Sequence, residues 1–234
     1  MPDPVPRAEL LRSLGRLTRG LSALFWGLPL TLITCISLAS GGWFKSFGIA
    51  LPLATTGLLL YGLLLLGRFQ RQERVWRNAL DRTQLLAVIN LGLSPFLYWW
   101  NKVPGQPLFA DMVALLAVTS LVFLSHLNLV LERLSAMLPD ETLRHETRQF
   151  APANRILLTT ALILVVAHEV FERIGIVPPQ LLDVIMSVVE GNRLLLLIIF
   201  VLLPLAMTLA LIWKTKEVIL ESVFGGEHPP KDSG

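Results

Sequence analysis

The residues of this chain most able to do chemistry lie together in one short run, Ala-His-Glu-Val-Phe-Glu-Arg at 167–173. Helical spacing puts His168 near Glu172 and Glu169 near Arg173, each pair four residues apart on a shared face. An apolar run surrounds them, and ionisable groups at membrane depth are costly unless they are paired or hydrated. We therefore predict a polar site formed by His168, Glu169, Glu172 and Arg173 that handles a proton, a cation or a quinone headgroup. The same residues also fit an interfacial ion-pair cluster with Arg193, and that alternative stays open.

His126 and Asn90 are weaker candidates, each inside an apolar run. A haem held by two histidines needs both ligands at one depth. At about 1.5 Å per residue, His126 lies about 10 Å from the basic edge of its span and His168 about 20 Å from the basic edge of its own. The sequence therefore predicts no haem, and we expect a hydrogen bond between Asn90 and His126 instead. The single Cys35 gives no zinc pattern, and no metal or other cofactor is predicted.

Glu190 stands at the end of segment 178–190, in the position of a pore helix in many six-span cation channels. A selectivity filter must return to the outer surface after its pore helix, but only Gly191, Asn192 and Arg193 separate this segment from the next apolar run. A helix lying flat on the outer face is the favoured interpretation. The chain also lacks the glycine-rich phosphate loop, the His-Glu-x-x-His motif and the Gly-x-Ser-x-Gly motif, so an enzyme is not favoured.

The elements that carry these residues are long apolar runs, which predict membrane-spanning helices. Hydrophobic residues make up 53% and charged residues 16% of the 234 positions, and the mean hydropathy is +0.63. A soluble domain is about 25% charged. A bilayer core about 30 Å thick needs roughly 20 mostly apolar residues of helix. We predict an all-α bundle of about six spans, at 21–40, 48–67, 83–100, 108–131, 156–173 and 194–213.

The distribution of lysine and arginine predicts how these spans are oriented. If the chain crosses six times, sixteen of its 20 basic residues fall on one side of the membrane and four on the other. Positively charged loops tend to stay in the cytoplasm. Both chain ends are therefore predicted to be cytoplasmic, and the compact loops favour the inner (plasma) membrane of a bacterium.

The segments outside the spans predict three surface helices and a polar tail. A basic amphipathic helix at 7–19 lies within the cytoplasmic lead 1–20, and further helices are expected at 139–150 and 178–190. The cytoplasmic tail is 214–234. A signal peptide cleaved after Ala39 is an alternative to a retained first span, but the apolar run is longer than the usual 7–15 residues.

These features favour a non-catalytic subunit or scaffold of a membrane complex. The expected partners are anionic lipids at the cytoplasmic face and other membrane subunits or a second copy of the chain, without nucleic acid. Four-residue ladders of small residues, which include Ala50, Ala54 and Gly62, are typical of close helix packing. The alternative is a small transporter or channel that uses the outer cluster of His168 and its neighbouring glutamates.

Overall fold

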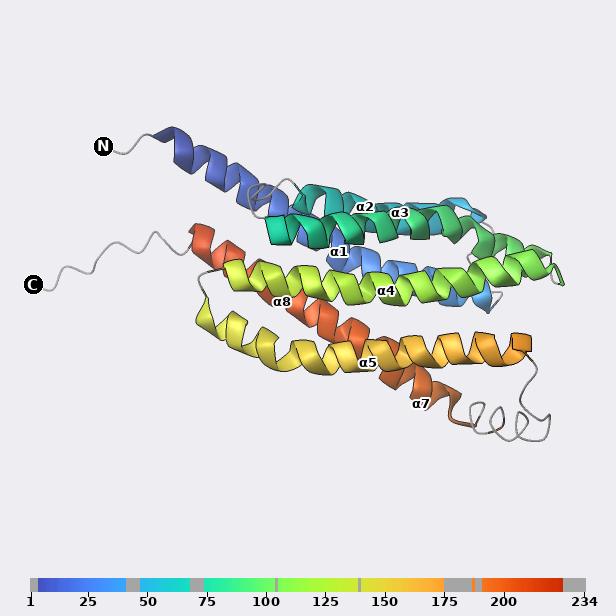
Figure 1. Cartoon of the computed structure of the whole chain (residues 1–234). Coiled ribbons are helices and arrows are strands. Elements are labelled where there is room, and N and C mark those ends of the chain that lie inside the picture. Colours follow the sequence, from blue (N-terminus) through green and yellow to red (C-terminus); the bar gives the residue numbers. More distant parts are fainter. Residues whose placement is uncertain are drawn as a thin grey trace, which may run out of the picture.

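The computed structural model consists almost entirely of helices that lie side by side (Figure 1). It describes residues 4–40, 47–67, 74–103, 105–138, 140–174, 187 and 191–224, and side chains over the same ranges except at 4–11, 172–174, 193–194 and 222–224. The helices are α1 (Pro4–Ala39), α2 (Ala50–Leu66), α3 (Arg74–Lys102), α4 (Pro107–Met137), α5 (Glu141–Ile174), α7 (Arg193–Leu197), the π-helix η2 (Ile198–Leu202) and α8 (Leu203–Phe224).

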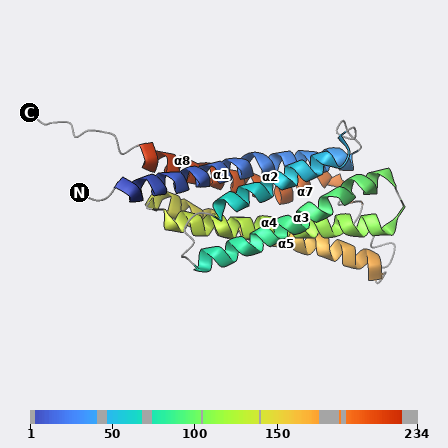
Figure 2. The same cartoon turned by 90° about the horizontal axis from the view of Figure 1, so that it is seen from above.

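Successive helices run in opposite directions and form a ring. Each of α1 to α4 contacts the next helix in the chain, α5 contacts α4 and α8, and α8 contacts α1. The pairs α1–α3 and α4–α8 also touch across the middle of the ring. The elements α7, η2 and α8 form one continuous segment that runs back towards the start of α1. The first and last described residues therefore lie at the same end of the bundle (Figures 1 and 2).

Leucines at helical spacing form the core. On α1 these are Leu17, Leu21 and Leu24, which are fully buried, and they pack in the same cluster as leucines of α2 and α4. The outer surface is also apolar: the side chains of Trp26 and Ile156 are 64% and 66% exposed. An apolar exterior around an apolar core is the arrangement expected of helices whose surroundings are lipid.

Within the described residues, four helical segments are long and apolar enough to cross a membrane, so the protein is a membrane protein with transmembrane helices. These segments are Arg12–Ala39, Pro107–Met137, Glu141–Phe171 and Leu195–Glu221. The other two elements differ from them. With 17 residues, α2 is about 26 Å long, which is shorter than the ~30 Å hydrocarbon core, and the first nine residues of α3 include Arg74, Arg77, Asp81 and Arg82.

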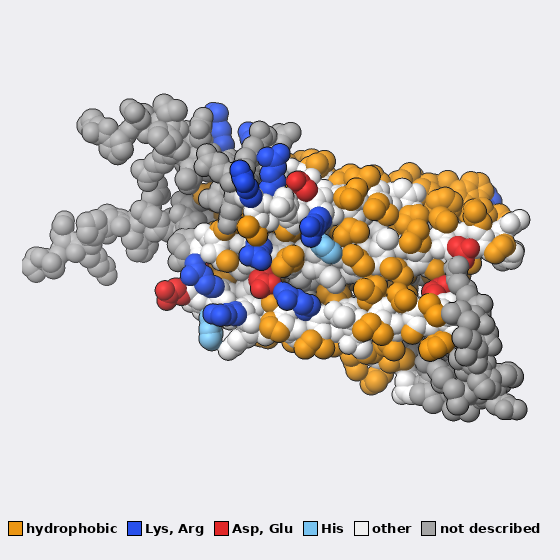
Figure 3. All heavy atoms as spheres, in the orientation of Figure 1, with side chains coloured by type: hydrophobic (Ala, Val, Ile, Leu, Met, Phe, Trp, Pro, Cys, Tyr) orange, Lys and Arg blue, Asp and Glu red, His pale blue; other side chains and the backbone are white. Residues whose placement is uncertain are grey.

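Basic side chains gather at the end of the bundle where α1 begins and α8 ends, and hydrophobic side chains cover most of the rest of the face shown in Figure 3. On α1, Arg12, Arg16 and Arg19 are exposed while Leu17 is buried. The amphipathic pattern predicted for residues 7–19 is therefore present over the residues whose side chains are described. The helix is continuous with the first span, because α1 runs unbroken to Ala39 and includes Pro29 in its interior.

Residues 139–150 also do not form a separate surface helix. Asp140 caps the start of α5 through its Oδ1, which accepts hydrogen bonds from the backbone N–H groups of Thr142 (2.8 Å) and Leu143 (3.2 Å). Leu143 is buried, so this part of α5 packs into the bundle. The helix changes direction in its first third (Figure 1), near Pro152, which lacks a backbone N–H. The helix predicted at 178–190 falls almost wholly outside the described residues.

Candidate functional site

Three polar side chains from three helices meet inside the bundle. Asn128 of α4 accepts a hydrogen bond from Asn154 of α5, with 2.9 Å between Asn154 Nδ2 and Asn128 Oδ1. Asn128 Nδ2 donates to the hydroxyl of Thr208 on α8 at 2.9 Å, and that hydroxyl lies 2.8 Å from the carbonyl of Pro204. Thr208 is fully buried and Asn154 is 3% exposed. We call this set the amide network.

Helical periodicity carries these polar groups inward. Asn154 lies on the same face of α5 as Thr147, Leu158 and Ala161, which are all buried. Thr208 is placed in the same way on α8, where the buried Ile212 follows one turn later. The inward face of each helix therefore combines apolar residues with a few polar ones, which on α5 are Thr147 and Asn154 and on α8 are Thr208 and Thr215.

The network leaves one acceptor without a partner. Asn154 Oδ1 is buried and has no hydrogen bond within the described part of the chain. An unpaired buried carbonyl oxygen costs about 1–3 kcal/mol.

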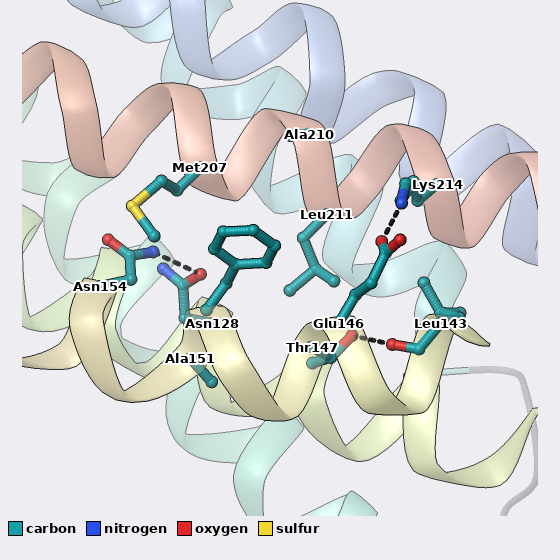
Figure 4. A pocket seen from close by; sticks show the side chains of 11 residues that line it. Asn128, Leu143, Glu146, Thr147, Ala151, Asn154, Met207, Ala210, Leu211 and Lys214 are labelled. Carbon is teal, nitrogen blue, oxygen red and sulfur yellow. Dashed lines mark hydrogen bonds and ion pairs between the residues drawn. The ribbon is translucent and has the colours of Figure 1, made fainter. Parts of the chain in front are cut away.

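A cavity of about 320 Å³ adjoins the network between α4, α5 and α8; we call it the basic-end cavity. Asn128 and Asn154 line one end of it, and an ion pair between Glu146 of α5 and Lys214 of α8 lines the other (Figure 4). Its remaining wall is largely apolar and includes Phe150, Met207 and Leu211. Phe150 is 57% exposed, so this cavity reaches the surface of the bundle.

A second cavity of about 510 Å³ occupies the other half of the bundle; we call it the central cavity. Its wall comes from α1 to α5, η2 and α8, is mostly apolar and contains no charged side chain. Asn90 lines it, is 7% exposed, and has an Oδ1 with no partner among the described residues. Hydroxyl groups on the same wall donate to their own helices: Thr34 to Leu30, and Thr56 to Pro52.

The two cavities approach each other to within one helical turn. On α4, Leu124 lines the central cavity and Asn128 lines the basic-end cavity, which separates them by about 6 Å along the helix. On α8, Leu205 lines the central cavity, and Met207, two residues later, lines the basic-end cavity. The amide network and the leucines one turn away are therefore the barrier between the cavities.

The wall of the central cavity also contains the one irregular helix of the described chain. In η2 the backbone N–H of Leu203 bonds the carbonyl of Ile198, five residues earlier, and Phe200 and Val201 face the cavity. Pro204 follows and cannot donate to the carbonyl of Phe200. π-helical turns of this kind are frequent at functional sites.

The predicted cluster at 168–173 lies elsewhere. His168 and Glu169 are near the end of α5, at the end of the bundle away from most of the basic residues, and neither lines a cavity described above. The side chains of Glu172 and Arg173, and all of Glu190, lie outside the described residues. A functional site at His168 and its neighbours stays a prediction.

The predicted hydrogen bond between Asn90 and His126 is wrong. His126 Nδ1 lies 3.0 Å from the carbonyl of Val122, on its own helix, and does not line either cavity. Asn90 instead lines the central cavity.

Sequence reasoning missed Asn128, Asn154, Thr208, Glu146 and Lys214. A signal for Asn128 existed, because an amide within a transmembrane run marks a functional or packing site as Asn90 does. Thr208 lies within an apolar run, but nothing local distinguishes its hydroxyl from that of an ordinary packing threonine. Asn154 and Lys214 flank apolar runs and Glu146 lies before one, where polar residues are ordinary.

The described residues offer no metal site, since they contain no group of three or more His, Cys, Asp or Glu side chains that could hold an ion. A second ion pair, Arg155 Nη2 to Glu132 Oε2 at 3.0 Å, joins α5 to α4 but lines neither cavity. No protein-family model matches this chain, and no curated protein or solved structure is similar to it.

Proposed function

We propose that the protein is a small transporter that carries an amphipathic molecule between the two halves of a bacterial inner membrane. The observation that carries this proposal is the pair of cavities in opposite halves of the bundle, separated by about one helical turn at the amide network. Transporters bind their substrates near the midplane, in sites reached alternately from each side.

The proposal includes six spans, with both ends in the cytoplasm. The alternating helix directions and the basic side chains at one end support this orientation. A helix as short as α2 is accommodated where the bilayer thins locally. The basic end would then lie against the anionic lipids of the cytoplasmic leaflet.

The cavity walls favour an amphipathic substrate. Both walls are mostly apolar, so a fully polar solute would lose its hydration without replacement. A fully apolar molecule would gain nothing from the polar side chains on the two walls, such as Asn128, Glu146 and Asn90. A molecule with an apolar chain and a polar group satisfies both requirements, and such molecules cross a bilayer slowly because their polar group must enter hydrocarbon.

The walls of the two cavities also contain parts that a transport cycle would use. Breaking the Glu146–Lys214 pair would open the basic end between α5 and α8. Rearrangement of η2 would move Phe200 and Val201 in the wall of the central cavity. Lys214 and η2 lie on the same continuous helical segment, which runs from α7 to α8. One movement of that segment would therefore couple the ion pair to the wall of the central cavity.

Reconstituted vesicles test the proposal. One- and two-chain phospholipids labelled with NBD on an acyl chain are mixed in at trace amounts, and dithionite then bleaches the label in the outer leaflet only. We expect the protein to expose inner-leaflet label that stays protected in protein-free vesicles. Asn128→Leu removes the centre of the network and should reduce the rate towards the protein-free value.

Thr208→Val keeps the side-chain shape and serves as a milder variant. Thr119→Val is the matched control, because Thr119 lies on α4 and bonds only its own helix, 2.8 Å from the carbonyl of Leu115, outside both cavities. If no labelled lipid moves faster than in protein-free vesicles, or if Asn128→Leu moves lipid as fast as Thr119→Val, the transporter proposal fails.

A non-catalytic subunit is the second candidate. Its motivation is the outer face of α2, where Ala50 and Ala54 are exposed although small residues at this spacing usually pack against another helix. Purification in mild detergent decides: partner subunits in fixed stoichiometry favour this candidate, and a chain that runs alone disfavours it.

A further inference from the structure

The central cavity presents a surface that is almost entirely hydrocarbon. Most of the hydroxyl groups on its wall donate to carbonyls of their own helices, among them Thr31 to Gly27 (2.7 Å) and Ser94 to Leu91 (2.9 Å). Asn90 also lies in this wall, but its Oδ1 is buried and presents almost no surface to the cavity. An internal water molecule needs two to four polar partners. The cavity is therefore a poor site for water or for a polar group along most of its length.

The wall of the central cavity extends along the bundle for about the thickness of one membrane leaflet. It covers about 17 Å of α1, from Leu28 to Ala39, and about 20 Å of α3, from Ala87 to Trp100. One leaflet contributes half of the ~30 Å hydrocarbon core, about 15 Å. At about 30 Å³ for a group of the size of a water molecule, a cavity of about 510 Å³ holds roughly 17 such groups. A methylene group has a similar size, so the volume suits one long hydrocarbon chain.

One end of the central cavity reaches the surface of the bundle; we call it the open end. It lies away from most of the basic residues, and Ile36, Ala39 and Trp100 line it there. All three of these side chains are exposed. Trp99 and Trp100 stand together near the end of α3, and tryptophan rings are enriched at the interface between membrane and water. The open end is therefore at the level of lipid headgroups.

The other end of the central cavity is closed by leucines. Leu28 and Leu205, which are both buried, line this closed end, and Leu124 lies one turn before Asn128 of the amide network. An empty space would leave these side chains without contacts on one side. A hydrocarbon chain supplies those contacts and requires no hydrogen bond from the wall.

From this geometry we propose that the central cavity binds one long hydrocarbon chain of a membrane lipid. The chain enters at the open end, its terminal methyl group lies against Leu124 and Leu205, and the polar group of the lipid stays at the level of Trp100. With both chain ends in the cytoplasm, this is a lipid of the outer leaflet. The inference rests on the proposed function for that orientation and for the movement of the lipid, and it identifies the substrate by its chain.

Photolabelling of the purified full chain in vesicles tests the proposal. Two probes with acyl chains of equal length carry a diazirine, one at the methyl end and one beside the carbonyl group, and mass spectrometry locates the adducts. The methyl-end diazirine should label Leu28 and Leu205, which lipid outside the bundle cannot reach, and the other should label Trp100. Labelling confined to outer-surface residues such as Trp26 and Ile156, or the reverse order of depth, would overturn the proposal.

A matched pair of variants tests whether the chain follows the cavity. Ala117 of α4 lies on the wall between the open and closed ends. In Ala117→Trp the indole ring occupies the path, so adducts at the closed end should be lost while those at the open end remain. Ala206→Trp is the control, because Ala206 is exposed and lines neither cavity, and it should label as the original protein does. Equal labelling of the closed end in the two variants would contradict the proposal.

The chain has two sources, a phospholipid and a free fatty acid, so each probe is used in both forms. Closed-end labelling by either form supports the assignment, and the form that labels more strongly identifies the source. Binding and transport are tested separately. Closed-end labelling without movement of lipid in the dithionite assay overturns the transporter proposal alone, whereas movement without closed-end labelling overturns the hydrocarbon-chain assignment alone.

Discussion

At the scale of single residues, two glycines set the distance between α1 and α2. A Cβ built on Gly20 would meet the side chain of Leu66 and would lie 2.8 Å from the carbonyl oxygen of Gly62. A Cβ on Gly62 would lie 3.0 Å from the carbonyl oxygen of Gly20. The two helices therefore cross backbone to backbone at this point, as small residues allow in membranes. Gly62 is one of the small residues from which close helix packing was predicted, and it lies at this crossing.

We predict that Gly20→Ala destabilises the protein by about 1–3 kcal/mol, because the added methyl group must push α1 and α2 apart. Thermal unfolding in detergent measures the effect. The matched control is Gly57→Ala on α2, where a Cβ would meet nothing within 4 Å. That variant should gain up to about 1 kcal/mol from helix propensity. Equal stability of the two variants would show that the crossing is not tight.

At the scale of elements, the amide network and the π-helix mark the places where the helices depart from simple apolar packing. Hydrogen bonds between transmembrane side chains average only about 0.6 kcal/mol, so the network contributes modestly to stability. Its larger consequence is to hold polar groups at the point where the two cavities come closest. The irregular backbone of η2 is accommodated because it lies in the wall of a cavity, where non-helical hydrogen bonding is tolerated at membrane depth.

We predict that Pro204→Ala slows lipid movement severalfold in the vesicle assay while the protein stays folded. Alanine restores an N–H that can bond the carbonyl of Phe200, which favours a regular α-helix over the π-helical turn. Phe200 and Val201 would then turn relative to the central cavity that they line.

Pro29→Ala is the control for this change, since Pro29 also lies inside a helix but lines neither cavity. It should raise stability by up to about 3 kcal/mol and leave the transport rate as it is. If the Pro204→Ala protein moves lipid at the original rate, the π-helical turn is not needed for transport.

At the scale of the whole molecule, the number of crossings depends on the α2–α3 pair. If both helices span, the connection between them lies on the cytoplasmic side with the other basic residues. If neither spans, this connection stays on the outer side, because α1 ends and α4 begins there. The five arginines at 68–82 favour the cytoplasmic side.

We predict that a cysteine at position 74 is protected from an impermeant maleimide in intact cells and becomes labelled after permeabilisation. The variant is Arg74→Cys in a Cys35→Ser background, which removes the chain's single native cysteine. Gln106→Cys, an exposed site between α3 and α4, should be labelled in intact cells. Labelling of position 74 before permeabilisation would favour four crossings.

Much of the helical architecture could be predicted from the sequence. The apolar runs at 108–131 and 156–173 lie inside α4 and α5, and the run at 194–213 lies inside the pass from α7 to α8. The helix predicted at 7–19 as the lead into the first span lies within α1, whereas the helix predicted at 139–150 is not a separate surface element, because the chain continues it past Pro152 as α5. Of the candidate residues named from the sequence, Asn90 lines the central cavity, and a functional role for any of them stays a prediction.

The sequence by itself determined that hydrocarbon surrounds long helices of this chain and that basic residues gather at one end, because length, apolar composition and charge are local properties. Only the tertiary structure decided which polar residues meet. In a soluble protein the apolar face of a helix points inward, but here the outer face is as apolar as the core, so the sequence pattern hardly marks the inward side. The meeting of Asn128, Asn154 and Thr208 depends on the rotation and register of three helices far apart in the chain. Those are set by packing such as the Gly20–Gly62 crossing and the leucine core, and no single segment contains that information.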